Sequence, residues 1–125
     1  MRRLGLVFTF LAAAIAQDPA TECREQYREE LEANSKSSLA HFNLAQCYSL
    51  KNNYVGAVNE FREALQGDRE PAWIIVWSYI ERGKIFDLTR QRQRALNEYR
   101  LAEETRDDTR GAQDEVAKYK KMPYR

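Results

Sequence analysis

Two cysteines, Cys23 and Cys47, are the side chains best suited to covalent chemistry in this sequence. In an oxidising compartment an even number of cysteines favours a disulfide. A bridge would close a loop of about 25 residues and stabilise the fold by roughly 3 kcal/mol, by restricting the unfolded chain. Two buried free thiols are the alternative, because cysteine also packs as a small apolar residue. The chain has no CxxC motif and a single histidine, His41, so we expect no metal site.

The other polar residues do not form a recognisable catalytic set. A single histidine in a helix more often packs or faces solvent than takes part in catalysis, and no second histidine or nucleophile motif accompanies it. Neither GxGxxG nor GxxxxGK[ST] occurs. The carboxylate pair Glu103 and Glu104 would point in different directions on a helix. We therefore expect no enzyme activity and no cofactor.

Length and charge limit the class of protein. The chain has 125 residues, with 20 Lys+Arg against 19 Asp+Glu and 43% hydrophobic residues, which is typical of one soluble globular domain. The balanced charge argues against a nucleic-acid partner, which would favour a basic surface. Only 5 glycines and 3 prolines occur, so helices are favoured over a turn-rich β protein.

The N-terminal segment 1–16 has the three parts of a signal peptide: two arginines, an apolar run, and small residues at Ala14 and Ala16. We expect cleavage after Ala16, then a flexible leader over 17–21, in a protein exported to the periplasm or secreted, most naturally by a bacterium. The apolar run is about a dozen residues long, against the roughly 20 that a membrane-spanning helix needs. A retained anchor is the alternative, but we expect no stable membrane insertion after cleavage.

Hydrophobic periodicity predicts a succession of helices with short breaks. The expected ranges are 22–33, 38–51, 54–66, 71–88, 90–104 and 109–120. Gly67 is placed to end one helix and Pro71 to begin the next, while Thr89 could cap the one after. The helix over 71–88 is apolar on more than one face, so it is either buried on two sides or offers one side to a ligand.

A pattern of small and aromatic residues occurs twice, 38 residues apart. In each copy an aromatic follows a small residue by three positions, and small, aromatic and small residues follow at fixed intervals. Small residues let two helices approach closely, and aromatic rings fill the space beside the crossing, so a helix pair explains each copy. The copies are Ala45, Tyr48, Ala57, Phe61 and Ala64, and Gly83, Phe86, Ala95, Tyr99 and Ala102.

This spacing resembles the tetratricopeptide repeat, with units over about 38–71 and 76–109. The resemblance implies an all-α domain over 22–122, in which antiparallel helix pairs stack as a short right-handed superhelix. The helices over 22–33 and 109–120 would then be caps. Two departures from the family pattern are Arg82, at a normally apolar position, and a spacing of 38 rather than 34 residues. An ordinary antiparallel helical bundle is the alternative.

The resemblance also implies a concave groove lined by the first helix of each pair. An apolar floor with a polar rim would suit an extended or helical peptide, and tryptophan often dominates such binding. Alternatively, Trp73 and Trp77 belong to the core. The implied groove positions hold Leu39, Phe42, Gln46, Ser49 and Leu50 in the first unit, and Trp77, Ile80, Lys84, Asp87 and Leu88 in the second. The candidate partner-binding residues among them are Phe42, Gln46, Trp77, Ile80, Lys84 and Asp87.

These features together predict a non-catalytic protein-interaction module or assembly accessory of the cell envelope, whose partner is a protein or peptide. A self-associating structural protein is the alternative, because the apolar helix over 71–88 could pair in a homodimer. A redox factor would need an exposed, reactive thiol at Cys23 or Cys47.

Overall fold

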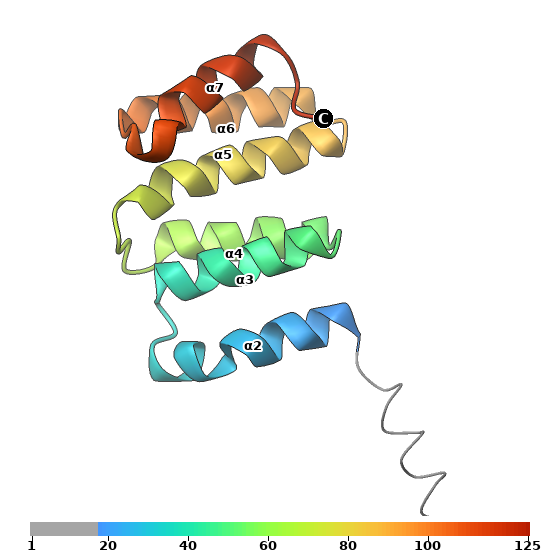
Figure 1. The fold of residues 1–125 in the computed structure, drawn as a ribbon, viewed down its shortest axis with the longest axis vertical. Helices are drawn as coiled ribbons and strands as arrows, with labels where there is room; N and C mark the ends of the chain where they lie inside the picture. Colours follow the sequence, from blue (N-terminus) through green and yellow to red (C-terminus); the bar gives the residue numbers. More distant parts are fainter. Residues whose placement is uncertain (1–17) are drawn as a thin grey trace, which may run out of the picture.

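The computed structural model describes residues 18–125, so the predicted signal peptide over 1–16 lies outside the described residues. Residues 18–125 form six α-helices and one 3-10 turn, without a strand. The predicted all-α architecture of stacked helix pairs is confirmed: α3 packs on α4 and α5 on α6, with α2 and α7 at the two ends of the stack (Figure 1). The elements are α2 (Pro19–Ala33), α3 (Ser38–Leu50), α4 (Tyr54–Gln66), α5 (Trp73–Leu88), α6 (Arg92–Thr105), η1 (Thr109–Gly111) and α7 (Ala112–Lys121).

The first helix begins earlier than the sequence pattern indicated. The Asp18 carboxylate accepts a hydrogen bond of 2.7 Å from the Thr21 backbone N–H, and Pro19 occupies the first turn, where its missing N–H costs nothing. That hydrogen bond lowers the pKa of Asp18. Residues 19–21 are therefore helical, and the prediction of a flexible leader is wrong for them.

Two other helix starts also differ from expectation. Helix α5 begins at Trp73 rather than Pro71, after a turn in which the Ile74 N–H donates to the Pro71 carbonyl. Thr89 ends α5 instead of capping α6, because its hydroxyl donates to the Ile85 carbonyl at 2.8 Å. The sixth predicted helix is divided into η1 and α7.

The repeated small residues mark the helix crossings. All five alanines of the pattern are fully buried, and a Cβ placed on Gly83 would overlap the Tyr99 ring. The first pair packs around Phe61, the second around Tyr99, and Trp77 contacts both cores. The small residues thus let α3 pack closely on α4, and α5 closely on α6. The alanines are Ala45, Ala57, Ala64, Ala95 and Ala102.

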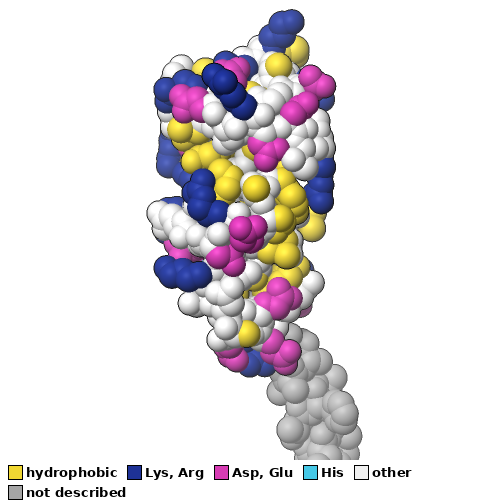
Figure 2. All heavy atoms as spheres, turned by 90° about the vertical axis from the view of Figure 1, so that its left-hand side faces the viewer, with side chains coloured by type: hydrophobic (Ala, Val, Ile, Leu, Met, Phe, Trp, Pro, Cys, Tyr) yellow, Lys and Arg dark blue, Asp and Glu magenta, His cyan; other side chains and the backbone are white. Residues whose placement is uncertain are grey.

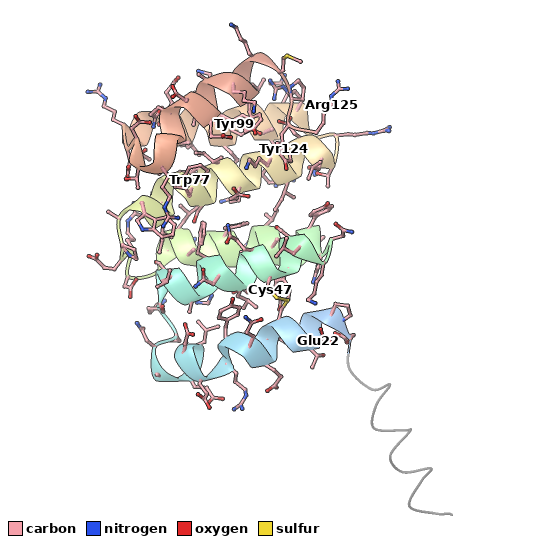
Figure 3. All side chains as sticks on the ribbon, in the orientation of Figure 1. Glu22, Cys47, Trp77, Tyr99, Tyr124 and Arg125 are labelled. Carbon is pink, nitrogen blue, oxygen red and sulfur yellow. A yellow bond between two sulfur atoms is a disulfide. The ribbon has the colours of Figure 1, made fainter. Side chains whose placement is uncertain are left out.

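Helix α2 is joined to α3 by a disulfide, and its side chains Ala20, Tyr27 and Leu31 pack on the first core. Cys23 and Cys47 are bonded, with an S–S distance of 2.07 Å and a Cα–Cα distance of 5.8 Å (Figure 3). Cys23 is the buried residue of α2, and Lys51 at the end of α3 forms an ion pair of 3.2 Å with Glu22. The bridge therefore reinforces the packing of α2 on the first helix pair. Within residues 18–125, no helix is both long enough and apolar enough to cross a bilayer.

Candidate functional site

A groove lies between α3 and α5, and Arg110 of η1 also lines it. It encloses about 450 Å³. Leu39 and Trp73, near the first residues of α3 and α5, are among the residues that line it. Figure 2 views the side of the stack on which α3 and α5 begin and shows apolar side chains gathered in its middle, between Lys or Arg and Asp or Glu side chains. The lining residues are Leu39, Phe42, Asn43, Gln46, Trp73, Trp77, Glu81 and Arg110.

Phe42 forms the rigid floor of the groove. Its side chain is 4% exposed and makes edge-to-face contacts with Trp73 and Phe61, with ring centroids 5.3 and 5.4 Å apart. Such contacts fix ring positions through the quadrupoles of the rings as well as through burial. Leu39, one turn before Phe42 on α3, is 39% exposed and offers apolar surface at the mouth. The floor is therefore preorganised and the mouth is accessible.

The two tryptophans have both of the roles that the sequence left open. Trp73 and Trp77 are each partly buried against the core, and each also lines the groove. The Trp77 indole N–H donates to the Thr109 carbonyl at 2.9 Å, so the η1 turn fixes the orientation of this ring. The Arg110 guanidinium lies over the Trp73 ring, 4.2 Å from its centroid. Cation–π contact of this kind favours planar stacking and places a positive charge at the groove wall.

Of the six residues predicted to line a groove, the structure brings three together. Phe42, Gln46 and Trp77 lie in this groove, and Gln46 is exposed on its rim. Ile80 does not: its side chain is fully buried in the second core, because that face of α5 packs against α6 and α7. Ile80 therefore does not line the groove as expected, because α7 covers this part of α5.

Lys84 and Asp87 are also directed away from this groove. Lys84 forms an ion pair of 3.2 Å with Glu81 and lies over the rings of Tyr119 and Tyr124. The Asp87 side chain is fully buried and accepts hydrogen bonds from the Tyr99 hydroxyl, from Arg92 and from the Tyr124 backbone N–H. The second half of α5 therefore serves internal contacts.

Arg110 is a groove residue that the sequence reasoning missed. It belongs to a turn, has φ of 58° and follows no apolar period, so helix periodicity gave no signal for it. Asn43 and Glu81 were also missed, although each lies on a helix beside a predicted groove position. Their polar character identifies them as solvent-facing but does not show that they border a hollow.

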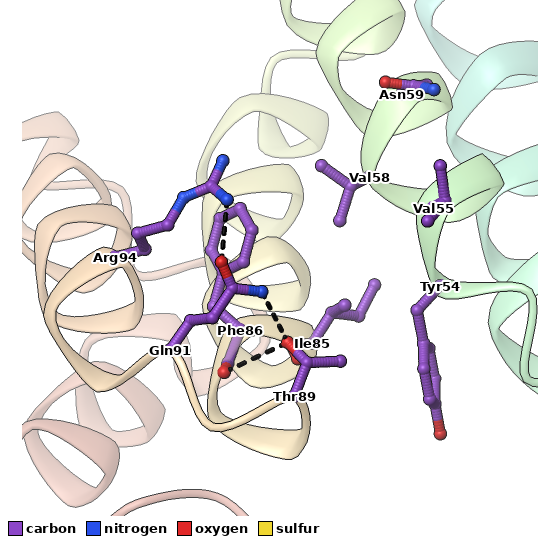
Figure 4. A pocket seen from close by; sticks show the side chains of 9 residues that line it. All are labelled: Tyr54, Val55, Val58, Asn59, Ile85, Phe86, Thr89, Gln91 and Arg94. Carbon is purple, nitrogen blue, oxygen red and sulfur yellow. Dashed lines mark hydrogen bonds between the residues drawn. The ribbon is translucent and has the colours of Figure 1, made fainter.

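A second, smaller pocket lies between α4 and the turn that joins α5 to α6 (Figure 4). It encloses about 210 Å³. The Arg94 guanidinium stacks on the Phe86 ring at 4.2 Å and donates to the Gln91 side chain at 2.8 Å. This pocket lies between the two repeat units, so a sequence pattern within one unit could not indicate it. Its lining residues are Tyr54, Val55, Val58, Asn59, Ile85, Phe86, Thr89, Gln91 and Arg94.

His41 joins α3 to α4. Its Nδ1 is 2.7 Å from Glu60 Oε1, and its Nε2 is 2.9 Å from the Ser35 carbonyl. The hydrogen bond to Glu60 raises the pKa of His41. Burial raises the pKa of Tyr119 to about 12 and also raises the pKa of Tyr99, where the hydrogen bond to Asp87 adds to the effect. With both ring nitrogens engaged, His41 links two helices and has no free nitrogen for proton transfer.

Among residues 18–125 no cluster of three or more His, Cys, Asp or Glu side chains is arranged to hold a metal ion. No protein-family model matches the chain, and no significant match is found to a curated protein or to a solved structure.

Proposed function

We propose that this chain is a non-catalytic protein-interaction module of the tetratricopeptide type, acting as an assembly accessory in the cell envelope. Its partner would be an extended or helical segment of another protein, bound in the α3–α5 groove. The observation that carries the proposal is the groove itself, in which two tryptophans and Phe42 meet in one solvent-accessible hollow. Aromatic anchors in a preorganised cleft are the usual source of binding energy at peptide interfaces.

Two further features support the proposal. The residues that carry the repeat resemblance are buried at helix crossings, as the tetratricopeptide type requires. The Cys23–Cys47 bridge is compatible with an oxidising, exported compartment.

The groove contains its own reporter, because Trp73 and Trp77 are the two tryptophans of the chain and both line it. We would crosslink the full chain in intact cell envelope, identify the attached segments, and titrate them as synthetic peptides while recording tryptophan emission. The matched variants are Leu39→Asp at the groove mouth and Leu50→Asp, which lies on the same helix outside the groove and is 86% exposed.

We expect a specific partner peptide to change the emission and to lose about tenfold or more in affinity with Leu39→Asp, while Leu50→Asp changes the affinity less than about twofold. The proposal fails if the recovered peptides leave the emission unchanged, or if both variants bind equally well.

Self-association is a second candidate function, favoured by apolar side chains at the end of the molecule where α3 turns into α4. Leu50 is 86% exposed and Val55 is 77% exposed. Large exposed aliphatic side chains that lie close together often mark an interface. Light scattering over a range of concentrations tests this: a mass that doubles, and returns to the monomer value with Leu50→Asp, would favour self-association. A constant monomer mass would exclude it.

A further inference from the structure

The segment 122–125 turns back from α7 and lies against the second half of α5, while Trp77 marks the first half (Figure 3). Tyr124 is its anchor. The Tyr124 ring meets the Tyr119 ring edge to face, with centroids 5.2 Å apart and an interplanar angle of 88°. The Lys84 ammonium is 5.1 Å from the centroid of the Tyr124 ring, and the Tyr124 backbone N–H donates to Asp87 at 2.9 Å.

These contacts are of the kind that a protein makes with a bound peptide. A backbone N–H is captured by a carboxylate, and an aromatic side chain packs against both a second ring and a cation. The rest of the segment is loosely held, since Met122 is 69% exposed and Pro123 is also exposed. The segment therefore depends on one side chain and one backbone hydrogen bond.

The residues beneath Tyr124 are held in place independently of it. Asp87 also accepts from the Tyr99 hydroxyl at 2.8 Å and forms an ion pair with Arg92 at 3.0 Å. Lys84 is held by its ion pair with Glu81. When Tyr124 leaves, these partners keep the carboxylate and the ammonium in position, so the surface stays preorganised for another ligand.

This surface adjoins the α3–α5 groove. Glu81 lines that groove and also pairs with Lys84, so the two sites meet along one face of α5. A partner segment that extends along α5 from Trp77 would reach Tyr124.

We propose that Lys84, Asp87 and Tyr119 form a second binding site, here termed the tyrosine cradle, for a peptide segment that carries a tyrosine. Segment 122–125 is its intramolecular ligand, which a partner segment must displace. The inference goes beyond the proposed function, since it does not require a partner in the α3–α5 groove. A short tether gives the intramolecular ligand a millimolar effective concentration, so a competing segment binds more weakly while the cradle is filled.

The test uses a fluorescent, end-blocked peptide with the sequence of residues 120–125. It is titrated against the full chain and against the full-length Tyr124→Ala variant, which lacks the aromatic ring that fills the cradle and retains the backbone N–H of residue 124. We expect the variant to bind the peptide at least about fivefold more tightly, because the tethered competitor is gone. Met122→Ala, in the same segment but exposed, should behave like the unsubstituted chain.

Two further arms test the chemistry. The same peptide with alanine in place of tyrosine should not bind the Tyr124→Ala variant, and adding Lys84→Ala to that variant should weaken binding of the tyrosine peptide. In the unsubstituted chain, millimolar peptide should shift the amide resonances of Lys84, Asp87 and Tyr119, a readout that needs no variant to fold.

Equal binding to the two chains would overturn the proposal, and so would binding that does not need the peptide's tyrosine. Either result would leave the α3–α5 groove untouched, because Leu39→Asp probes other residues. Conversely, a failed Leu39→Asp test would leave the tyrosine cradle standing.

Discussion

The two helix pairs follow the same spacing but differ in chemistry at equivalent positions. In the first pair Phe61 fills the crossing as a purely apolar ring, whereas in the second pair Tyr99 takes that place and its hydroxyl donates to Asp87 at 2.8 Å. The residue equivalent to Asp87 is Ser49, and its buried hydroxyl has no hydrogen-bond partner in the described part of the chain. The small and aromatic residues that are shared set the geometry, while the polar residues that differ determine what each pair attaches to.

Helix α7 and segment 122–125 pack on the second helix pair. Asp87 binds Tyr124 as well as Tyr99 and Arg92, and α7 buries Val116 against the same core. At the first pair, Asp68 accepts hydrogen bonds from the Ser38 backbone N–H and from Asn34 at the end of α2, and the disulfide also joins α2 to α3. The groove lies between α3 and α5, while α7 and segment 122–125 cover the second half of α5.

The largest expected effect is at the buried carboxylate. Asp87→Ala leaves the Tyr99 hydroxyl without an acceptor and Arg92 without its partner, so we expect it to lower the free energy of unfolding by about 3–5 kcal/mol. Ser49→Ala, at the equivalent position of the first pair, should cost less than about 1 kcal/mol, because its hydroxyl makes no hydrogen bond. Urea denaturation of both variants measures the difference, and similar losses would show that the two crossings are energetically alike.

The next effect is at the ends of the stack. Replacing both Cys23 and Cys47 with serine should lower the free energy of unfolding by roughly 3 kcal/mol, since the unfolded chain regains its freedom. The loss should be local, because Cys23 is the buried residue of α2. Amide hydrogen exchange should therefore quicken in α2 and stay slow in α7, whose Val116 is buried without any crosslink. Equal acceleration in α7 would mean that the bridge stabilises the stack as a whole.

The third expected effect concerns the small residue at each helix crossing, Gly83 in the second pair and Ala45 in the first. In Gly83→Ala the added methyl would overlap the Tyr99 ring, which Asp87 holds in place. Overpacking costs about 1–3 kcal/mol, which exceeds the roughly 0.5–1 kcal/mol that alanine gains over glycine in a helix. We expect a net loss of about 1–2 kcal/mol in thermal or urea denaturation. Ala45→Gly, the matched change in the first pair, should lose about 1–2 kcal/mol, from helix entropy and from the loss of a fully buried methyl group. A stabilised Gly83→Ala variant would show that the Tyr99 ring moves freely.

The crossings themselves could be predicted from the sequence because close helix packing needs small residues at fixed intervals. Ala57 and Ala64, with their counterparts Ala95 and Ala102, are such small residues, and all four are fully buried. Helix α4 was predicted with its observed bounds, since Asn53 caps its first turn and Gly67 follows its last. Phe42, Gln46 and Trp77, three of the six predicted groove residues, line one groove because the repeat spacing fixes which faces of α3 and α5 meet.

The rest of the site depends on contacts from turns and from the end of the chain. Arg110 reaches Trp73 from a turn, and Tyr124 reaches Lys84 from an irregular segment, and neither position carries a periodic signal. Ile80 was expected in the groove because the resemblance assumes an open face along all of α5. Helix α7 covers that face in this chain, and how far an end helix overlaps its neighbour is decided by tertiary packing.

The smallest expected effect concerns the carboxylates that occupy equivalent positions in the two pairs, Glu60 and Glu98. Glu60 accepts a hydrogen bond from His41 and raises its pKa, whereas Glu98 lies 3.1 Å from Arg82 and has its own pKa raised by burial. A raised pKa in the folded state contributes stability that is fully present below the unfolded pKa and is lost as the pH rises through the folded value. For His41 that loss begins near its ordinary value of 6.5, while for Glu98 it begins near 4.5.

The free energy of unfolding should therefore fall slightly as the pH rises from about 6 to about 8, by less than about 1 kcal/mol. His41→Gln and Glu60→Gln should each flatten the curve in that interval, because each removes the pair. The fall that begins near pH 4.5 should remain in both variants, since it belongs to the second helix pair. Urea denaturation at about pH 5, 6.5 and 8 resolves the two intervals. A fall above pH 6 that persists in His41→Gln would assign it to another group and remove this distinction between the two helix pairs.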